Sequence, residues 1–281
     1  MIAGLPRTGT TSLFHILGEH PALYAPFRKE MGYFLFNWRR GEDWYRRAYR
    51  GMADGQVGLD VTPEYVFSAE AAERIAGFDA DVRVMLGVRD PADLASSLYR
   101  EYGQRYRMPP FAEFLQGYRY RRGASLLDVT LGGGAIPRLL ESWRARFGER
   151  LLLYDFDAFG REPLRMLQAL ERFLGVVPHF GPTTFRNWHL NRGDRRNSRL
   201  LSYVASRESL IEPLGRLLPA RWLRAAAKAF YGQPPSARGS APAASADCGL
   251  PLQEIFGEER LYVRRLFAAG PVVDGCGRAL S

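Results

Sequence analysis

Lysine is almost absent from this chain, although the chain is strongly basic. Its formal net charge is +9, and arginine supplies nearly all of the positive charge because Lys29 and Lys228 are the only lysines. A basic protein of this kind suits anionic partners, such as nucleic acid or a phosphate-rich ligand. A genome that favours arginine codons would give the same composition. The rarity of lysine makes Lys29 a residue to examine.

Cysteine and long apolar runs are also scarce. Cys248 and Cys276 lack metal-ligand spacing and are too few for a disulfide framework, which favours a reducing, cytoplasmic location and no metal site. No run of about 18 apolar residues occurs, so we expect no membrane span. No signal peptide is expected before the first strand. The sequence gives no indication of the oligomeric state.

The order of apolar segments predicts an α/β fold. Short apolar runs alternate with longer amphipathic ones, which is typical of a mostly parallel sheet flanked by helices on both faces. The expected strands are Ile2–Gly4, Val57–Val61, Val82–Val88 and Leu151–Tyr154, with a weaker one at Leu23–Pro26. The expected helices are Thr10–Leu17, Ser68–Ala76, Ala92–Tyr106, Pro137–Phe147 and Pro163–Leu174. This pattern predicts a three-layer, P-loop-like fold.

We expect one domain over residues 1–281, with an α/β core at residues 1–198 and a helical C-terminal extension at residues 199–281. Arginine-rich helices are expected at Leu200–Leu218 and Trp222–Phe230. The composition of Gln233–Asp247, rich in Pro, Ser, Ala and Gly, predicts a flexible loop. A last helix, Leu252–Phe267, is expected to dock on the core.

The first expected strand leads into a loop that resembles a P-loop without its lysine. Gly4 and Gly9 have the spacing of G-x-x-x-x-G-K-[ST], Thr11 takes the final hydroxyl position, and Thr10 stands where the lysine belongs. Glycines let the backbone close on a phosphate, and the following helix N-terminus offers unpaired N–H groups. The loop is therefore expected to bind a phosphate-like group, and the missing lysine argues against hydrolysis of ATP or GTP.

A second candidate anion site follows the most apolar strand. Arg89 stands at the strand end, and Asp90 suits the N-cap of the next helix. Ser97 lies two turns into that helix, where it could form a fork with Arg89 for a second phosphate. In an ordinary packing alternative, Arg89 pairs with Asp93 and Ser97 only packs.

These segments are expected to meet. Gly4–Thr11, Asp60–Pro63 and Arg89–Pro91 each follow an apolar strand. Ligands of parallel sheets bind at the carboxyl ends of the strands, where such loops converge. The sequence therefore predicts one anion-binding edge built from three polar loops.

Together the loops resemble those of sulfotransferases that use 3′-phosphoadenosine 5′-phosphosulfate (PAPS), in the bacterial and heparan-sulfate-type branch. In that family the first loop holds the 5′-phosphosulfate, and R-[DN]-P-x-x-R-x-x-S-x-Y holds the 3′-phosphate. Arg89, Pro91, Ser97 and Tyr99 match the second pattern, whereas Leu94 replaces its second arginine.

The resemblance covers about Met1–Val176. Phe27–Phe34 resembles the family's K-E-x-x-[YF]-F segment. Leu59–Tyr65 resembles E-K-[ST]-P-x-Y, with Val61 in place of the lysine. A looser similarity extends to Asn191–Leu200.

The resemblance implies transfer of a sulfuryl group from PAPS to a hydroxyl of a carbohydrate or small natural-product acceptor, giving a sulfate ester and 3′-phosphoadenosine 5′-phosphate (PAP). Lys29 and Arg7 would act on the sulfuryl group, and Asp60 would be the general base in the place of the family's glutamate. Glu30 and His189 are alternative bases. The residues that would bind PAPS are Arg7, Thr8, Gly9, Thr10, Thr11, Ser12, Arg89 and Ser97.

Three other functions are compatible with parts of the sequence. A small-molecule kinase would need a cation for the γ-phosphate, which the missing lysine argues against. A basic nucleic-acid-binding module would suit the charge, but the chain has no recognised binding motif, so no nucleic-acid partner is expected. A non-catalytic nucleotide-binding protein is compatible with the departures at Val61 and Leu94.

Overall fold

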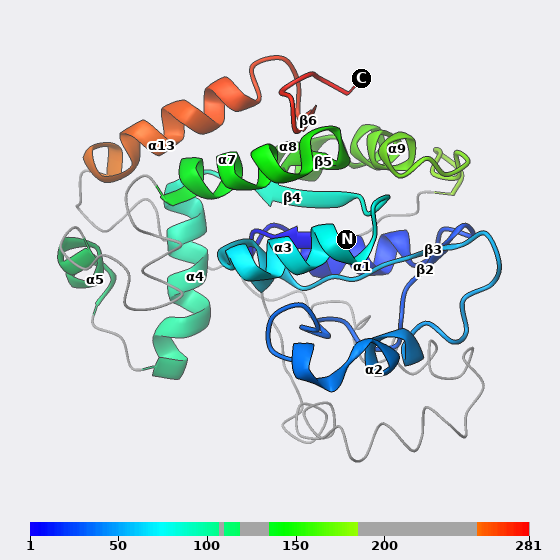
Figure 1. The fold of residues 1–281 in the computed structure, drawn as a ribbon. Coiled ribbons are helices and arrows are strands. Elements are labelled where there is room, and N and C mark those ends of the chain that lie inside the picture. Colours follow the sequence, from blue (N-terminus) through cyan, green and yellow to red (C-terminus); the bar gives the residue numbers. More distant parts are fainter. Residues whose placement is uncertain (107–109, 119–134, 185–251, 281) are drawn as a thin grey trace.

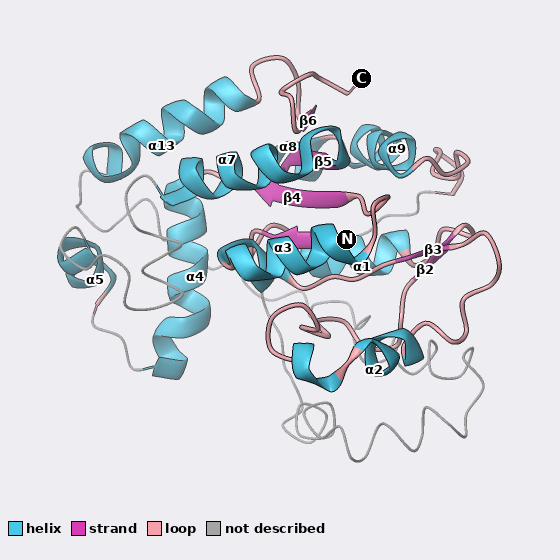
Figure 2. Ribbon diagram, in the orientation of Figure 1, coloured by secondary structure: helices cyan, strands magenta, loops and turns pink. Residues whose placement is uncertain are grey.

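The computed structural model describes residues 1–106, 110–118, 135–184 and 252–280 (Figure 1). A four-stranded sheet with the order β1-β4-β5-β6 lies at its centre (Figure 2). The strands are β1 (Ile2–Gly4), β4 (Val84–Val88), β5 (Leu151–Asp155) and β6 (Val272–Asp274). The first three run parallel, and β6 is antiparallel to β5. The sheet is therefore mostly parallel, as the sequence predicts.

A second pair of strands continues the sheet beyond β1. β2 (Leu23–Tyr24) and β3 (Val57–Gly58) are parallel to each other. The chain after β3 then runs beside β1, because the Ile2 N–H donates to the Asp60 carbonyl at 2.8 Å and the Thr62 N–H donates to the Ile2 carbonyl at 3.1 Å. The chain segments before all three predicted loops thus run in the same direction and end at the same edge.

Helices cover both faces of the sheet (Figure 1). Alternate strand residues belong to opposite cores, so that Leu86 faces one core and Met85 the other. One core is closed by α3 (Ala69–Phe78) and α7 (Ala135–Phe147). The other is closed by α1 (Thr10–Leu17), α8 (Phe156–Arg161) and α9 (Pro163–Leu174). The predicted three-layer α/β fold is confirmed.

The remaining elements surround this core. The α-helices are α2 (Glu42–Arg47), α4 (Pro91–Tyr106), α5 (Phe111–Tyr118) and α13 (Leu252–Leu266). Short 3-10 helices are η1 (Trp38–Arg40), η2 (Pro63–Phe67) and η3 (Gly148–Arg150). Within the described residues, no helix is both long enough and apolar enough to cross a membrane.

Most predicted elements occur within a few residues of their expected ends. The helices Thr10–Leu17 and Pro163–Leu174 and the strand Ile2–Gly4 have the predicted bounds. The strand expected at Leu23–Pro26 is shorter, because it pairs only over Leu23–Tyr24. The helices expected at Leu200–Leu218 and Trp222–Phe230, and the loop at Gln233–Asp247, lie outside the described residues, and the domain division stays a prediction.

The end of the chain returns to the core. α13 buries Phe256 in the same core as α7, which confirms the predicted docking of the last helix. β6 then adds an antiparallel strand beside β5. The sequence did not predict β6, because a run of three residues gives no measurable periodicity.

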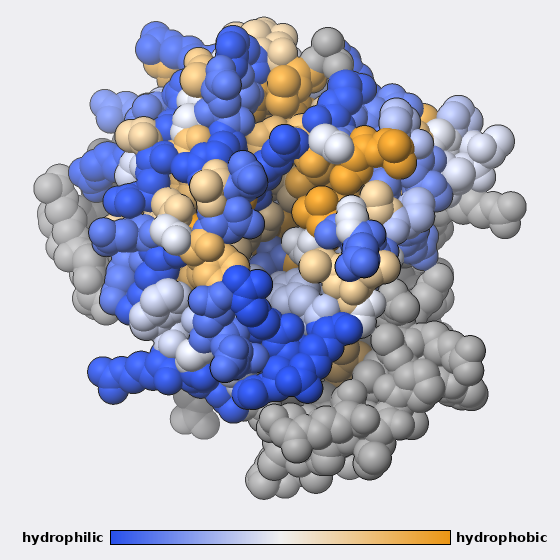
Figure 3. All heavy atoms as spheres, turned by 45° about the vertical axis from the view of Figure 1, so that its right-hand side comes forward, coloured by the Kyte–Doolittle hydropathy of each residue, from blue (hydrophilic) through white to orange (hydrophobic). Residues whose placement is uncertain are grey.

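The face in Figure 3 is mostly hydrophilic, with hydrophobic side chains gathered in a band between hydrophilic regions. The most exposed large hydrophobic side chains of the described residues include Phe36 and Val177. Single exposed apolar side chains of this kind are common on protein surfaces.

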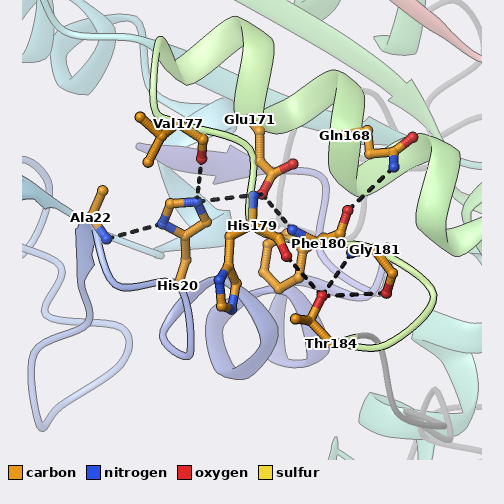
Figure 4. A network of polar contacts seen from close by, with 9 residues as sticks. All are labelled: His20, Ala22, Gln168, Glu171, Val177, His179, Phe180, Gly181 and Thr184. Carbon is orange, nitrogen blue, oxygen red and sulfur yellow. Dashed lines mark hydrogen bonds and ion pairs between the residues drawn. The ribbon is translucent and has the colours of Figure 1, made fainter.

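A buried polar network joins the end of α1 to the segment after α9 (Figure 4). The Glu171 carboxylate accepts from the backbone N–H groups of His179 at 2.7 Å and Phe180 at 2.8 Å. The His20 Nε2 lies 3.3 Å from the same carboxylate oxygen and 3.0 Å from the Val177 carbonyl. Glu171 thus fixes the path of residues 177–180 against the core.

Glu171→Ala is expected to destabilise the protein by about 2–3 kcal/mol, because a buried N–H group and a partly buried one would lose a charged acceptor. Urea unfolding followed by circular dichroism would measure this loss. Glu162→Ala is the matched control, since Glu162 forms an exposed pair with Arg165. Equal stability of the two variants would show that water replaces the carboxylate.

Candidate anion-binding and sulfuryl-transfer site

The first loop has the backbone shape that the glycine spacing predicts. Gly9 has a left-handed backbone (φ 76°) and accepts at its carbonyl the N–H of Leu13, which begins α1. A Cβ on Gly9 would lie 2.9 Å from the Phe156 ring, so the position also needs the absence of a side chain. The Thr8 hydroxyl donates to the Leu5 carbonyl at 2.6 Å. The Thr8 hydroxyl is therefore already used within the loop.

The other hydroxyls of the loop lie at the start of α1. Thr10 is buried, and Thr11 and Ser12 are partly buried. A helix N-terminus has unpaired N–H groups and favours an anion. The structure thus places these three residues where the sequence predicts a phosphate-binding turn.

The second loop has the predicted cap. The Asp90 carboxylate accepts the N–H groups of Ala92 at 2.9 Å and Asp93 at 3.2 Å, which fixes the start of α4. Arg260 of α13 donates to both oxygens of the same carboxylate, at 2.8 and 3.0 Å. A helix from the end of the chain therefore holds the loop that follows β4.

The two loops converge. The Arg7 Nε of the first loop donates to the Ser97 Oγ on α4 at 3.1 Å. Arg7 has a left-handed backbone (φ 68°), which is rare for a residue with a Cβ and is a feature of functional turns. The sequence predicted that these loops meet, and this contact is the direct observation of it.

Arg89 lies beside this contact. Its guanidinium carbon lies 5.0 Å from the centre of the Phe156 ring. Its buried Nε has no hydrogen-bond partner among the residues that the structure describes, and the same is true of the Ser96 Oγ. Burial lowers the pKa of Arg89, the carboxylates of Asp93 and Asp157 raise it, and the positive charges of Arg100 and Arg7 lower it again. A group of arginines with an unpaired buried donor fits an anionic ligand.

Lys29 lies at the end of the neighbouring segment. Its side chain is only 6% exposed, and its ammonium pairs with the carboxylate of Glu30. Glu30 has a left-handed backbone (φ 61°), and its N–H donates to the Val61 carbonyl at 2.9 Å. The rare lysine is thus a buried cation at the same edge of the sheet, and not a solvated surface residue.

Asp60 is buried beneath this segment. It is 3% exposed and accepts hydrogen bonds from the hydroxyls of Tyr45 at 3.0 Å, Tyr65 at 3.1 Å and Thr62 at 3.0 Å. Burial raises the pKa of Asp60, and the three hydroxyl donors act in the opposite direction. The role of Asp60 as a base stays a prediction, and His189 lies outside the described residues.

Glu64 is a further carboxylate at this edge, which the sequence prediction did not include. It is partly buried in η2, four residues after Asp60. Burial raises the pKa of Glu64, as does the nearby charge of Glu30, while Lys29 lowers it. Glu64 therefore belongs to the same group of charges as Lys29.

The sequence is similar to those of known sulfotransferases. The chain is 28% identical over 181 residues to heparan sulfate glucosamine 3-O-sulfotransferase 3A1 of Mus musculus, a match that covers 63% of this chain and 45% of that protein. It is 27% identical over 180 residues to heparan sulfate glucosamine 3-O-sulfotransferase 6 of the same organism, covering 63% and 52%. The similarity to these sulfotransferases thus extends over more than half of the chain.

A solved structure has the same fold. The sulfotransferase from Alicyclobacillus acidocaldarius superposes with a TM-score of 0.56 at 24% identity, over 79% of this chain and 96% of that one. No family model matches the chain. The chain spans about half the length of the curated relatives it matches.

The two departures of this chain from the expected motifs are packing positions. Leu94 is fully buried in the core beside α3 and α7. Val61 is buried in the opposite core and pairs with Ile2. In this packing, an arginine or a lysine at these positions would place a charge among apolar side chains.

The sequence prediction did not include two other residues at this site. Phe156 directly follows β5, and its ring lies close to both Gly9 and Arg89. Phe156 could have been predicted to lie at the site, because it follows a parallel strand and all such strands end at the same edge of the sheet. Tyr45 gave no signal, since its contact with Asp60 depends on how α2 folds back.

Proposed function

We propose that this protein is a PAPS-dependent sulfotransferase that transfers a sulfuryl group to a hydroxyl. The hydrogen bond between Arg7 and Ser97 supports this function most directly, because it joins the two loops that the motifs assign to the two phosphates of one ligand. A nucleotide with phosphates at both its 5′ and 3′ ends needs two anion sites at a fixed separation. A nucleoside triphosphate needs only the first loop, and this loop lacks the usual lysine.

The residues present fit this donor. The N-terminus of α1 and the backbone around Gly9 would hold the 5′-phosphosulfate. Arg89 and Ser97 would hold the 3′-phosphate, and the unpaired Nε of Arg89 offers a donor for it. PAPS supplies an activated sulfuryl group whose leaving group is the 5′-phosphate of PAP.

In sulfuryl transfer, as in phosphoryl transfer, the transition state is loose and negative charge moves to the bridging oxygen. The Lys29 ammonium is buried and would stabilise that oxygen, where a low dielectric strengthens its effect. Arg7 would bind the outer oxygens of the transferred group. The protein thereby orients the donor and neutralises its leaving group.

The acceptor belongs to this proposal as well. The curated relatives are named for heparan sulfate glucosamine, which favours a carbohydrate hydroxyl, and a small natural product is the alternative. We propose no nucleic-acid partner. The arginines of the two anion loops, Arg7 and Arg89, are assigned here to the donor nucleotide. A bacterial source and a cytoplasmic location stay predictions from the motif branch and the low cysteine content.

Calorimetric titration with PAP, beside ATP and without metal, tests the proposed donor site. PAP is expected to bind at least about 100-fold more tightly than ATP, because each charged hydrogen bond at the 3′-phosphate contributes about 1.5–3 kcal/mol. A release assay with PAPS and a panel of glycans and simple alcohols would follow. Tighter binding of ATP than of PAP would overturn the proposal.

A further inference from the structure

Helix α13, near the end of the chain, is attached both to the core and to the second anion loop. It packs against α4 and α7 (Figure 1). Phe256 lies in the same hydrophobic core as α7, and the Tyr262 hydroxyl donates to the Glu141 carboxylate on α7 at 2.7 Å. Arg260, which lies between these two residues in the sequence, donates to Asp90 at the start of α4. One helix therefore connects α7 to the loop that follows β4.

The Arg260 guanidinium fixes the Asp90 carboxylate in position and in orientation. Its Nε lies 2.8 Å from Oδ2 of Asp90, and its Nη2 lies 3.0 Å from Oδ1. Oδ1 also accepts the N–H groups of Ala92 and Asp93, which begin α4. Two N–H···O bonds from one planar guanidinium define the geometry of a carboxylate better than a single bond does. The two side chains are only 23% and 27% exposed, so salt screens this pair less than a surface pair.

Asp90 stands between the two residues assigned to the 3′-phosphate. Arg89 directly precedes it in the chain, and Ser97 lies on the helix that it caps. The buried Nε of Arg89 has no hydrogen-bond partner among the described residues. An Asp90 carboxylate released from Arg260 would be an acceptor next to that donor. The position of Asp90 therefore affects both the direction of Arg89 and the availability of its Nε.

We propose that Arg260 is a positioning residue for the 3′-phosphate site, and that α13 is thereby coupled to donor binding. This inference rests on the proposed function. Arg260 acts through Asp90 and does not touch the nucleotide. It holds the start of α4 so that Arg89 and Ser97 point toward one phosphate, and it keeps the Asp90 carboxylate from pairing with Arg89.

The coupling acts in both directions, because a contact that improves the binding of a ligand is stabilised by that ligand to the same extent. PAP is therefore expected to slow hydrogen exchange of the α13 backbone amides in the parent protein. In Arg260→Ala, the same ligand should protect α13 much less. Exchange measured by mass spectrometry with and without PAP gives this comparison.

The main test measures the affinities for PAP and adenosine 5′-phosphosulfate by calorimetry in the full chain. Arg260→Ala is expected to weaken PAP binding by about 10-fold, a typical effect of a residue that acts on a ligand through another residue. Its affinity for adenosine 5′-phosphosulfate should stay close to that of the parent protein, because this ligand has no 3′-phosphate. In an Arg89→Ala background, Arg260→Ala should cause little further loss of PAP affinity, since the two residues act on the same group.

Three further variants separate positioning from a general loss of stability. Arg260→Lys keeps the charge and should restore only part of the PAP affinity, because an ammonium lacks the planar fork of donors. Tyr262→Phe removes the hydrogen bond from α13 to Glu141 and should bind PAP as the parent protein does. Arg264→Ala, an exposed change on the same helix, controls for the loss of one positive charge. Urea unfolding of each variant reports its stability.

The outcomes distinguish this inference from the proposed function. An Arg260→Ala protein with the PAP affinity of the parent would overturn the inference and leave the proposed function standing. Equal losses for PAP and adenosine 5′-phosphosulfate, or the same PAP loss in Tyr262→Phe, would also overturn it, because they would report a loosened fold. Absence of PAP binding in the parent protein would instead overturn the proposed function.

Discussion

Lys29→Ala is expected to reduce PAP release from PAPS by about 100- to 1000-fold, the usual effect of removing one donor from a developing negative charge. The ammonium is almost fully buried, so water does not screen it and no other lysine of the described residues can replace it. The affinity for PAP should change much less than the rate, since PAP lacks the sulfuryl group. Single-turnover kinetics beside PAP calorimetry would measure both effects.

Lys29→Arg is the charge-preserving variant for this prediction. It should recover part of the rate, because a guanidinium has the charge but a different reach. Arg165→Ala, an exposed change on α9, controls for the loss of one positive charge. A Lys29→Ala variant with a full rate would mean that Lys29 only holds Glu30 in place.

Arg89→Ala is expected to weaken PAP binding by about 100-fold, which corresponds to the loss of a charged hydrogen bond of roughly 1.5–3 kcal/mol. Its buried Nε lacks a partner among the described residues, so a bound 3′-phosphate would supply one. Adenosine 5′-phosphosulfate lacks the 3′-phosphate, and its affinity should change less than about threefold. Calorimetric titration of both ligands gives the comparison.

Removal of Arg89 also exposes the Phe156 ring on which it stacks, so folding has to be checked. The Arg165→Ala variant should bind both ligands as the parent protein does. Equal losses for PAP and adenosine 5′-phosphosulfate in Arg89→Ala would contradict a specific role at the 3′-phosphate. They would place Arg89 at the 5′ end instead.

The sequence by itself determined the layers of the fold and the edge that holds the site. Strand and helix periodicity located β1, β4, β5 and their helices, because long apolar patterns are local properties of the chain. The glycine spacing of the first loop and the cap at Asp90 were also local, and both occur as predicted. The convergence of Arg7 with Ser97 followed from the rule that parallel strands end together.

Only the tertiary structure decided the burial and the partners of the charged residues. Asp60 looks like an available carboxylate in the sequence, but in the structure it is buried and accepts hydrogen bonds from Tyr45, which lies on α2, and from Tyr65. Arg260 reaches Asp90 from 170 residues away in the chain, a contact that no local pattern encodes. The spacing of residues in the sequence indicates which side chains lie at the same edge of the sheet. The desolvation and hydrogen bonding that set their chemistry depend on side chains brought together from separate elements.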